Sequence, residues 1–379
     1  MKVSILGFGT VGVGVYEMLQ NAAGLEAGTV LVRPGKADKP FKVTSIEEIT
    51  SDPSVDAVAE VMGGIEPAFT YACAVLKAGK HFVTSNKALV AAHGIELDAL
   101  ARENGAAFLF SAACGGGVPF LHNIALAVES DSIISLGGIL NGTTNYMLDM
   151  MQSRGMDYAD ALKDAQALGY AEADPTADVS GLDALRKIML GCAAAYGKLP
   201  ADGLLWEGIE SFTAADVEHL KTLGLTCRLL AKGCENPDGS VSAYVEPVVF
   251  KANAPECSVL KNFNMAKYEG KNSGRIVLMG QGAGRYPTAS AVVRDLSDIL
   301  HGRKAMLKEG CVQVTADNSA PESAYYVRVD EKYAGRLEID CLYAPDRFKT
   351  VKMSVGAMHA IAKEIRKDGG KVFFAAVEE

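Results

Sequence analysis

The start of the chain constrains the fold more than any other part of it. The apolar run Val3-Ser4-Ile5-Leu6 predicts a buried strand, and a glycine-rich turn follows it directly and opens a helical pattern that continues to Ala22. In a strand–turn–helix unit of this kind, the first glycine permits the turn, the second lets the backbone approach a pyrophosphate, and the third allows close packing. The free N–H groups and the dipole at the start of the helix attract the phosphates. We therefore expect a dinucleotide to bind at Gly7, Phe8, Gly9, Thr10, Val11 and Gly12.

Short apolar runs alternate with helical patterns over the first 110 residues. Further strands are predicted at 30–32, 57–61 and 81–84, and a helix at 67–78. This alternation is typical of an α/β fold with a doubly wound parallel sheet of the Rossmann type. A helical pattern at 289–300 returns to this sheet, so we predict a dinucleotide-binding domain made of residues 1–116 and 285–315.

A Gly-rich hinge, Gly115-Gly116-Gly117-Val118-Pro119, marks a change of pattern. The following region, 117–284, mixes strands and helices without regular alternation, which predicts an α+β domain. The expected strands are 132–140, 242–250 and 275–279, and the expected helices are 146–153, 158–168 and 182–196. A polar break at 316–323 precedes a small α+β segment at 324–379.

Composition excludes several classes of protein. The formal net charge is -9, and no run of basic residues offers a surface for nucleic acid or for anionic lipid. No apolar stretch approaches the roughly 20 residues that a membrane span needs. The eight cysteines show no CxxC or metal-like spacing. We therefore expect reduced thiols in a cytoplasmic protein that binds a small molecule.

The segment after the second strand bears on the choice of coenzyme. An Asp or Glu at this point would bind the ribose 2′-hydroxyl of NAD. The sequence has Arg33-Pro34-Gly35-Lys36 instead, and both cations can pair with the 2′-phosphate of NADP. The alternative is a pair of solvated surface cations. We favour NADP, with NAD as a second coenzyme.

Lys87 follows a predicted strand, in Thr84-Ser85-Asn86-Lys87. Ligands of open α/β sheets bind at the carboxyl ends of the strands, so Lys87 is a candidate for the site, although a surface lysine is the ordinary alternative.

The stretch from Gly169 to Lys187 is acidic and leads into a helix on which Asp183 and Lys187 lie four residues apart. One interpretation is an exposed i,i+4 ion pair among solvated carboxylates. The other is a site for carbonyl reduction, which needs a proton donor such as Lys187. A substrate with an α-ammonium group needs carboxylates, for which Glu172 and Asp178 are candidates. The polar turn that starts at Asn141 can hydrogen-bond the substrate, cap a helix, or do both.

These residues together resemble the homoserine dehydrogenase family. The motifs that carry the resemblance follow the family order over residues 1 to about 315. They are Gly7 to Gly12, Glu60 to Pro67, Ala78 to His81, Ser85 to Leu89, Ile139 to Tyr146, Gly169 to Lys187, Gly282 to Gly284 and Pro287 to Val293.

The resemblance implies hydride transfer between a nicotinamide and L-aspartate 4-semialdehyde, with L-homoserine as the reduced product. It implies that Lys187 gives the proton to the carbonyl oxygen and that Lys87 positions the substrate and the reacting end of the cofactor. Glu172 matches the acid that holds the substrate, Asp178 and Asp183 match the other acids of the site, and Gly284 approaches the cofactor. The remaining substrate contacts are expected from Tyr170, Thr143 and Asn141. The family also implies a homodimer or homotetramer, formed through the middle domain and often by extension of a shared sheet.

The chain departs from the family pattern at two places. Ser111 stands where the family often has a glutamate at a monovalent cation site, so sodium would be held by the backbone carbonyls of Cys114, Gly116 and Val118. In the tail, Tyr325 to Val329 resembles the first strand of an ACT regulatory domain, but Lys332 to Leu337 replaces the Pro-Gly ligand loop. The tail is therefore a contracted ACT-like segment, and the chain has no aspartate kinase region.

Two rival functions follow from single features. An acylating aldehyde dehydrogenase would use Cys114 as its nucleophile, but no histidine is an obvious base for that thiol. A nucleotide-sensing regulator would combine the dinucleotide domain with a ligand-binding tail, but it would have no need of Lys87 and Lys187.

Overall fold

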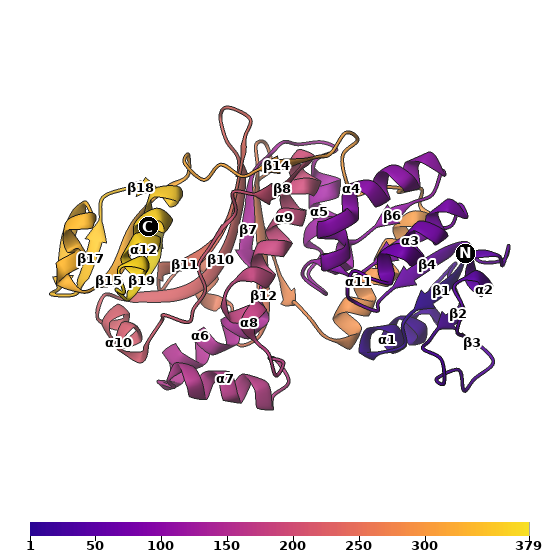
Figure 1. Ribbon diagram of the computed structural model, residues 1–379, viewed down its shortest axis with the longest axis horizontal. Helices are drawn as coiled ribbons and strands as arrows, with labels where there is room; N and C mark the ends of the chain where they lie inside the picture. Colours follow the sequence, from indigo (N-terminus) through magenta and orange to yellow (C-terminus); the bar gives the residue numbers. More distant parts are fainter. Residues whose placement is uncertain (379) are drawn as a thin grey trace. The chain divides into compact units, whose positions relative to one another are not determined.

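The computed structural model describes residues 1–378, and the chain in it divides into two compact units (Figure 1). Unit 1 comprises 1–133, 193–199 and 280–312, and unit 2 comprises 134–192, 200–279 and 313–379. Over residues 1–378, none of the helices combines the length and the apolar character that crossing a bilayer requires.

A six-stranded parallel sheet forms the centre of unit 1, in the order β3-β2-β1-β4-β5-β6. Its strands are β1 (Lys2–Leu6), β2 (Glu26–Leu31), β3 (Lys42–Val43), β4 (Ala57–Glu60), β5 (His81–Thr84) and β6 (Phe108–Leu109). The order reverses at β1 and β4, as in dinucleotide-binding folds, and ligands of such sheets lie beyond the strand ends at that point. The predicted Rossmann-type parallel sheet is confirmed.

Helices cover this sheet, so its central strands are apolar on both faces. In β1, for example, Val3, Ile5 and Leu6 are all fully buried. The helical segments are α1 (Thr10–Leu19), α2 (Glu47–Thr50), α3 (Ala68–Lys77), α4 (Lys87–Glu103), the 3-10 turn η1 (Ser111–Ala113), α5 (Phe120–Ala127) and α11 (Arg285–Leu300).

The helix α11 belongs to unit 1 although it follows unit 2 in sequence. It packs against α1, where a side chain at Gly14 would meet Arg285 and Ala289 at 3.0 and 3.1 Å. In Figure 1 the orange ribbon of α11 accordingly lies among the indigo and purple elements of unit 1. The helix that the sequence predicted at 289–300 starts earlier, at Arg285.

Unit 2 is built on one large mixed sheet, in the order β13-β12-β7-β10-β11-β19-β15-β17-β16. These strands are β7 (Ile133–Ile139), β10 (Leu225–Glu235), β11 (Val241–Lys251), β12 (Phe263–Gly270), β13 (Gly274–Gln281), β15 (Glu322–Val329), β16 (Ile339–Ala344), β17 (Arg347–Thr350) and β19 (Val372–Glu378). The short strands β9 (Leu205–Trp206) and β18 (Met353–Ser354) attach to it, and β8 (Lys198–Asp202) pairs with β14 (Val312–Thr315) in a separate ribbon.

The helical segments of this part of the chain are α6 (Gly142–Arg154), α7 (Tyr158–Ala167), α8 (Thr176–Val179), α9 (Leu182–Tyr196), α10 (Ala214–Thr222), η2 (Pro255–Ser258), η3 (Glu331–Arg336) and α12 (Val355–Lys367). Several of these helices end at a glycine. Gly155, for example, ends α6 with φ +68°, a left-handed conformation that glycine adopts without steric cost.

The C-terminal segment shares the sheet and the core of unit 2. Strand β19 lies parallel to β11 and antiparallel to β15, so the last strand of the chain joins the segment to the rest of the sheet. One buried cluster contains Leu230 and Val248 together with Val327 and Phe374. The segment therefore cannot be removed without opening that core. The short η3 occupies the stretch that replaces the family's ligand loop.

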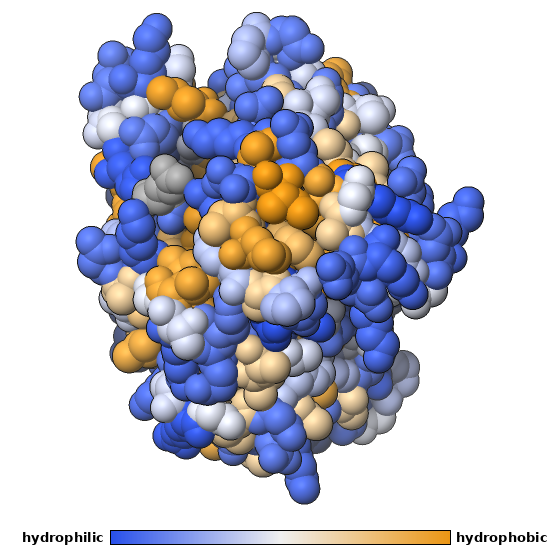
Figure 2. All heavy atoms as spheres, turned by 90° about the vertical axis from the view of Figure 1, so that its left-hand side faces the viewer, coloured by the Kyte–Doolittle hydropathy of each residue, from blue (hydrophilic) through white to orange (hydrophobic). Residues whose placement is uncertain are grey.

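Both outer strands of the large sheet carry exposed apolar side chains. On β13, Val277 and Met279 are 43% and 58% exposed, and on β16 Ile339 and Leu342 are 38% and 62% exposed. Figure 2 faces the C-terminal segment and shows hydrophobic residues (orange) there among hydrophilic ones (blue). The unit boundaries also differ from the domain ranges predicted from the sequence. The first segment of unit 1 ends at Ile133, whereas the predicted domain ended at residue 116.

Candidate active site

The glycine-rich turn between β1 and α1 has the geometry that an anion site needs. Gly7 adopts φ +99°, and a Cβ on Gly12 would lie 2.1 Å from the Gly7 carbonyl oxygen. A Cβ on Gly9 would meet nothing within 4 Å, so the backbone is open to a ligand at that position. Gly9 precedes α1 and offers no side-chain cap, which leaves the first N–H groups of that helix available for a pyrophosphate.

Arg33 and Lys36 lie at the two ends of a tight turn after β2. The Lys36 N–H donates to the Arg33 carbonyl at 3.0 Å, and Gly35 supplies the positive φ of +82° that the turn requires. Both side chains are exposed, and neither has an ion-pair partner among residues 1–378. Asp38, an acid that follows the turn, is bound by Lys42 at 2.6 Å. The segment therefore presents net positive charge beside the glycine-rich turn.

Lys87 is the first residue of α4, directly beyond the carboxyl end of β5. The turn before it is fixed by Asn86, whose Oδ1 caps the helix by accepting from Leu89 N at 3.2 Å, and whose own N–H donates to Thr84 Oγ1 at 2.9 Å. Lys87 is partly buried. It therefore starts from a rigid element at the strand end where ligands of such sheets bind.

Glu60 begins one of the motifs named from the sequence, but no role was predicted for it. It ends β4, it is fully buried, and its Oε1 accepts from Met62 N at 2.7 Å and from Gly63 N at 3.2 Å. Its Oε2 accepts from Thr84 Oγ1 at 2.5 Å. One carboxylate thus ties the loop after β4 to the end of β5. The signal in the sequence was an acid closing an otherwise apolar strand.

In unit 2, Lys187 and Asp183 form a buried ion pair on α9. Lys187 Nζ lies 2.7 Å from Asp183 Oδ2 and donates to the Leu140 carbonyl at 2.6 Å. The two residues are 8% and 6% exposed. The exposed surface pair considered from the sequence is therefore not what the structure shows. The ammonium group is held by one carboxylate and one carbonyl at the end of β7.

Asn141 joins this pair to Asp178. Its Nδ2 donates to Asp178 Oδ1 at 2.7 Å and to Asp183 Oδ2 at 2.8 Å. Thr143 Oγ1 lies 3.3 Å from Asp178 Oδ2 and donates to the Tyr170 carbonyl at 2.6 Å. Burial raises the pKa of Asp178, repulsion from Asp183 adds to that shift, and the hydrogen bond from Asn141 opposes it. The cluster thus contains two carboxylates and one ammonium group in a poorly hydrated setting.

Tyr170 and Glu172 lie on the more exposed side of the same region. The Tyr170 ring packs edge-on against Tyr146 at 5.0 Å, and the Tyr146 hydroxyl donates to Asp164. Burial and that acid raise the pKa of Tyr146 to about 12. Glu172 is exposed in the loop before α8, and its carbonyl accepts from Gln166. Its carboxylate is therefore positioned only by the loop backbone.

The hinge that carries Ser111 is buried and fixed by α11. Ser111 N donates to Asp295 Oδ2 at 2.8 Å, and Ser111 Oγ donates to the other oxygen of that carboxylate. Burial raises the pKa of Asp295 to about 7 despite these two hydrogen bonds. His122 lies 2.9 Å from the neighbouring Asp298. Cys114 is fully buried, as expected for a packing residue and not for a nucleophile open to substrate.

Gly116 and Gly284 mark close backbone approaches within unit 1. Gly116 has φ +51°, and a Cβ there would lie 2.5 Å from the Gly282 carbonyl oxygen. The Val118 carbonyl accepts from Phe120 N at 2.8 Å. Gly284 has φ +122°, is exposed, and precedes α11 without capping it.

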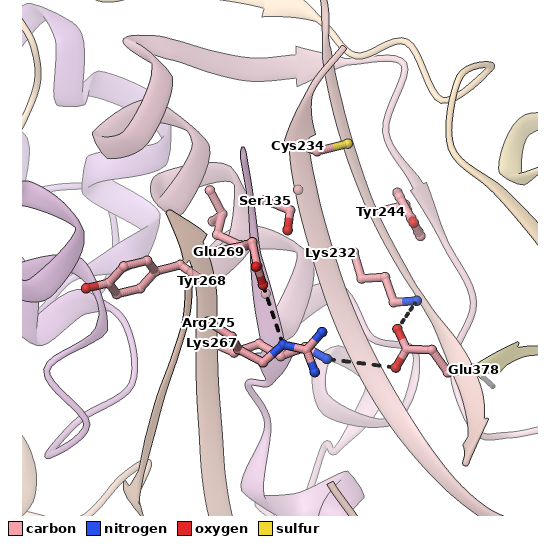
Figure 3. A pocket seen from close by; sticks show the side chains of 12 residues that line it. Ser135, Lys232, Cys234, Tyr244, Lys267, Tyr268, Glu269, Arg275 and Glu378 are labelled. Atoms are coloured by element: carbon pink, nitrogen blue, oxygen red, sulfur yellow. Dashed lines mark ion pairs between the residues drawn. The ribbon is translucent and has the colours of Figure 1, made fainter. Parts of the chain in front are cut away.

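A cavity of about 170 Å³ in unit 2 contains none of the predicted site residues (Figure 3). Lys232 and Lys267 point toward the Glu378 carboxylate, at 3.3 and 3.8 Å, and Arg275 pairs with Glu269 at 3.5 Å. Burial alone would raise the pKa of Glu378, but the two ammonium groups outweigh burial and lower it. The cations there are thus paired with the acids Glu256, Glu269 and Glu378, which indicates a structural role.

Comparisons with known proteins show the family of the chain. The family described as "Homoserine dehydrogenase, NAD binding domain" matches residues 7–111, and the family "Homoserine dehydrogenase" matches residues 119–297. The homoserine dehydrogenase of Corynebacterium glutamicum is 41% identical over 327 residues, covering 80% of this chain and 73% of its own. The crystal structure of a homoserine dehydrogenase from Thiobacillus denitrificans has a TM-score of 0.88 at 30% identity and covers 100% of this chain and 98% of its own. The chain belongs to the homoserine dehydrogenase family of oxidoreductases.

Proposed function

We propose that the buried cluster of unit 2 is the catalytic centre at which L-homoserine and L-aspartate 4-semialdehyde are interconverted. The observation that carries this proposal is the burial of Lys187 between the Asp183 carboxylate and the Leu140 carbonyl. In the reductive direction Lys187 donates a proton to the carbonyl oxygen while hydride reaches the carbonyl carbon. Asp183 holds the ammonium group in place and stabilises its charged form.

The substrate's α-ammonium group is the natural partner of the remaining acids. Asp178 supplies a carboxylate beside the Lys187–Asp183 pair, and Glu172 supplies an exposed one in the loop before α8. Thr143 and Tyr170 line the same region and are proposed to contact the polar groups of the amino acid. Residues 117–284 are accordingly proposed as the substrate-binding domain.

The cofactor is proposed to be NADP, with NAD accepted less well, in the domain formed by residues 1–116 and 285–315. The residues fit a dinucleotide, because the backbone is open at Gly9 and α1 begins without a side-chain cap. When bound, the nicotinamide supplies or accepts the hydride. Arg33 and Lys36 are placed to pair with the 2′-phosphate. A related archaeal enzyme, 25% identical with a TM-score of 0.68, was solved in complex with NADPH.

Lys87 and Gly284 are proposed to take part in cofactor binding in unit 1. Lys87 begins α4 at the carboxyl end of β5, where it can orient the substrate and the nicotinamide. Gly284 leaves the backbone before α11 uncovered and close to the helix that receives the pyrophosphate. Both positions belong to unit 1.

Sodium fits the hinge only through neutral ligands. Ser111 donates its hydroxyl to Asp295 and brings no carboxylate of its own, so the carbonyls of Cys114, Gly116 and Val118 remain as the candidate ligands. The Val118 carbonyl already accepts from Phe120. We therefore propose a weak sodium site at this hinge.

We also propose a homodimer formed at the β13 edge of the large sheet, with a homotetramer as the larger alternative. The support is an outer strand with exposed Val277 and Met279, to which a second copy can add its own strand. Light scattering on the purified protein measures the assembly. A cytoplasmic location is favoured because the nicotinamide cofactors and the amino-acid aldehyde are made inside the cell.

The direct test is absorbance at 340 nm with purified protein, L-homoserine, and NAD or NADP in parallel. Homoserine-dependent reduction, faster with NADP, is the expected result. No reaction in either direction with either coenzyme would remove the catalytic assignment. A faster rate with NAD would remove only the proposed role of Arg33 and Lys36.

A further inference from the structure

The side chain of Asn141 uses all of its hydrogen-bonding capacity inside the protein. Its Oδ1 accepts from Thr144 N at 2.9 Å and from Thr144 Oγ1 at 3.0 Å, and its Nδ2 donates to Asp178 and Asp183. An amide offers two donors and two acceptor sites, so nothing remains for a substrate. Asn141 is also only 4% exposed. The substrate contact expected from the sequence would require Asn141 to give up one of these hydrogen bonds.

The two carboxylates that Asn141 binds repel each other. Because both accept from one nitrogen, their nearest oxygens are no farther apart than the two hydrogen bonds placed end to end. At such a distance in a poorly hydrated site, two carboxylates tend to share one proton unless neutral donors or cations stabilise both charges. An amide is well suited to this place, because it donates to both oxygens and neither gains nor loses a proton at ordinary pH.

The backbone around Asn141 explains why the amide reaches both acids. Leu140 and Asn141 follow the last residue of β7, and Asn141 caps α6. The carbonyl of Leu140 accepts from Lys187, while the side chain of Asn141 donates to the acids of α8 and α9. A Cβ on Gly142 would lie 2.7 Å from the Asn262 carbonyl oxygen, so this turn has no room to shift in that direction. Two consecutive residues thus fix three charged groups.

We propose that Asn141 is a positioning residue that keeps Asp178 and Asp183 ionised side by side, so that Asp183 serves Lys187 while Asp178 serves the substrate's ammonium group. This inference rests on the proposed function of the cluster. The charged groups that face Asp178 are Asp183 and Lys187, both on α9. Its other polar neighbours, Asn141 and Thr143, are neutral. Of these two, Asn141 is the one that donates to both acids, so its loss favours protonation of one of them.

The cap of α6 gives a competing, purely structural role, and two variants separate the roles. Asn141→Ser and Asn141→Asp both keep a good helix cap, but serine is too short to bridge the two acids and aspartate has no donor when it is ionised. A structural role predicts activity close to that of the wild type in both. The control is Asp157→Ser at the exposed N-cap of α7, where Asp157 accepts from Asp160 N at 2.8 Å.

The measurement is kcat and KM for L-homoserine from pH 6 to pH 9, together with NADPH affinity by fluorescence. In Asn141→Ser we expect kcat/KM to fall at least about tenfold at pH 7, mainly through KM, and the deficit to shrink as the pH rises and Asp178 ionises again. Asn141→Asp adds a third negative charge, so its deficit does not recover at high pH. NADPH affinity stays unchanged, and Asp157→Ser matches the wild type throughout.

A double variant gives the sharpest test. If Asn141 acts by stabilising two adjacent charges, Asn141→Ser costs little once Asp178→Asn has removed one of them, so the double variant matches Asp178→Asn alone. Additive losses, or a loss in Asn141→Ser that is the same at every pH, would overturn the inference. Absence of homoserine turnover in the wild type would instead overturn the proposed function, so the two failures are distinguishable.

Discussion

The two charged regions proposed to act on the two ligands are built in opposite ways. Around Lys187 the polar groups are buried and bonded to one another, and one amide contacts two acids. Around Arg33 and Lys36 the cations stand in solvent on a turn that is fixed only by its backbone. Burying a charge costs free energy unless its partners are well placed to compensate it. An exposed charge acts independently and is screened by salt.

The difference follows from the chemistry that each region is proposed to perform. A proton donor must hold its geometry and charge through the reaction, which favours a rigid, dehydrated setting. Discrimination of a 2′-phosphate requires only positive charge within reach of a solvent-exposed anion. We therefore expect large and strongly coupled effects of substitution in the first region, and small, additive effects in the second.

The largest expected effect is that of Lys187→Ala. Loss of the proton donor should lower turnover by roughly two to four orders of magnitude, with little change in the dissociation constant of NADPH. Steady-state rates at 340 nm and fluorescence titration measure the two quantities. Lys187→Arg keeps the charge and serves as the matched variant. Turnover within about tenfold of the wild type in Lys187→Ala would show that the proton comes from another group.

The next effect concerns stability. Asp183→Ala leaves Lys187 buried beside the Leu140 carbonyl without its carboxylate, which should lower the free energy of unfolding by about 3–5 kcal/mol. Removing both residues should cost less than the two single losses added together, because the uncompensated charge is then gone. Chemical denaturation of the three variants measures this. Additive losses would mean that Lys187 and Asp183 do not stabilise each other, although they are 2.7 Å apart.

A smaller effect is expected in the exposed turn. Arg33→Ala should weaken NADP by about tenfold and leave NAD nearly unchanged, since only NADP carries the 2′-phosphate. The difference should shrink at high salt, in contrast to the effects at Lys187. Lys36→Ala should add to it independently. Equal weakening of both coenzymes would show that Arg33 does not contact the 2′-phosphate.

The sequence was informative about elements with a strong local signature. The strand before Gly7, the strand at 81–84 and the helix at 182–196 appear within one or two residues of the predictions. These segments combine apolar periodicity with glycine turns, which local rules capture well. The C-terminal segment was predicted only in outline. The position of β19 depends on pairing with β11, more than 120 residues earlier in the chain, which no local pattern records.

The site shows the same division. The chain positions of Lys87, Asp178, Asp183 and Lys187, together with the motifs around them, are enough to mark these residues as candidates. What the sequence left open was their burial and their partners. Asn141 was expected to contact the substrate, and in the structure its amide binds two acids, while no role had been predicted for the buried Glu60. Hydrogen-bond partners between residues tens of positions apart depend on packing, so they became visible only in three dimensions.

The last expected effect tests whether burial alone makes an acid functional. Asp295 is buried like Asp183, but it has hydrogen bonds from Ser111 in place of a lysine, and its pKa is about 7. Because this folded-state pKa lies above the unfolded value of 3.8, the stability it contributes is complete below pH 3.8 and is lost as the pH rises through about 7. At pH 8 the wild type therefore carries the cost of a buried carboxylate.

The amide introduced by Asp295→Asn has no such charge but keeps one acceptor for Ser111. We expect a net gain of about 2 kcal/mol at pH 8, after a lost hydrogen bond is allowed for, which is a rise in Tm of roughly 5 °C.

The gain in Asp295→Asn should disappear at about pH 5, where the wild-type carboxyl group is protonated, and homoserine turnover should be retained. Thermal unfolding at pH 5 and pH 8 checks the sign. Asp298→Asn is the matched control on the same helix, and it should destabilise unit 1 at both pH values because Asp298 pairs with His122 at 2.9 Å and lies 3.9 Å from Arg303. A loss of stability in Asp295→Asn at pH 8 would show that the Asp295 charge is compensated after all, as that of Asp183 is by Lys187. Both buried acids would then be compensated charges, and burial would not distinguish them.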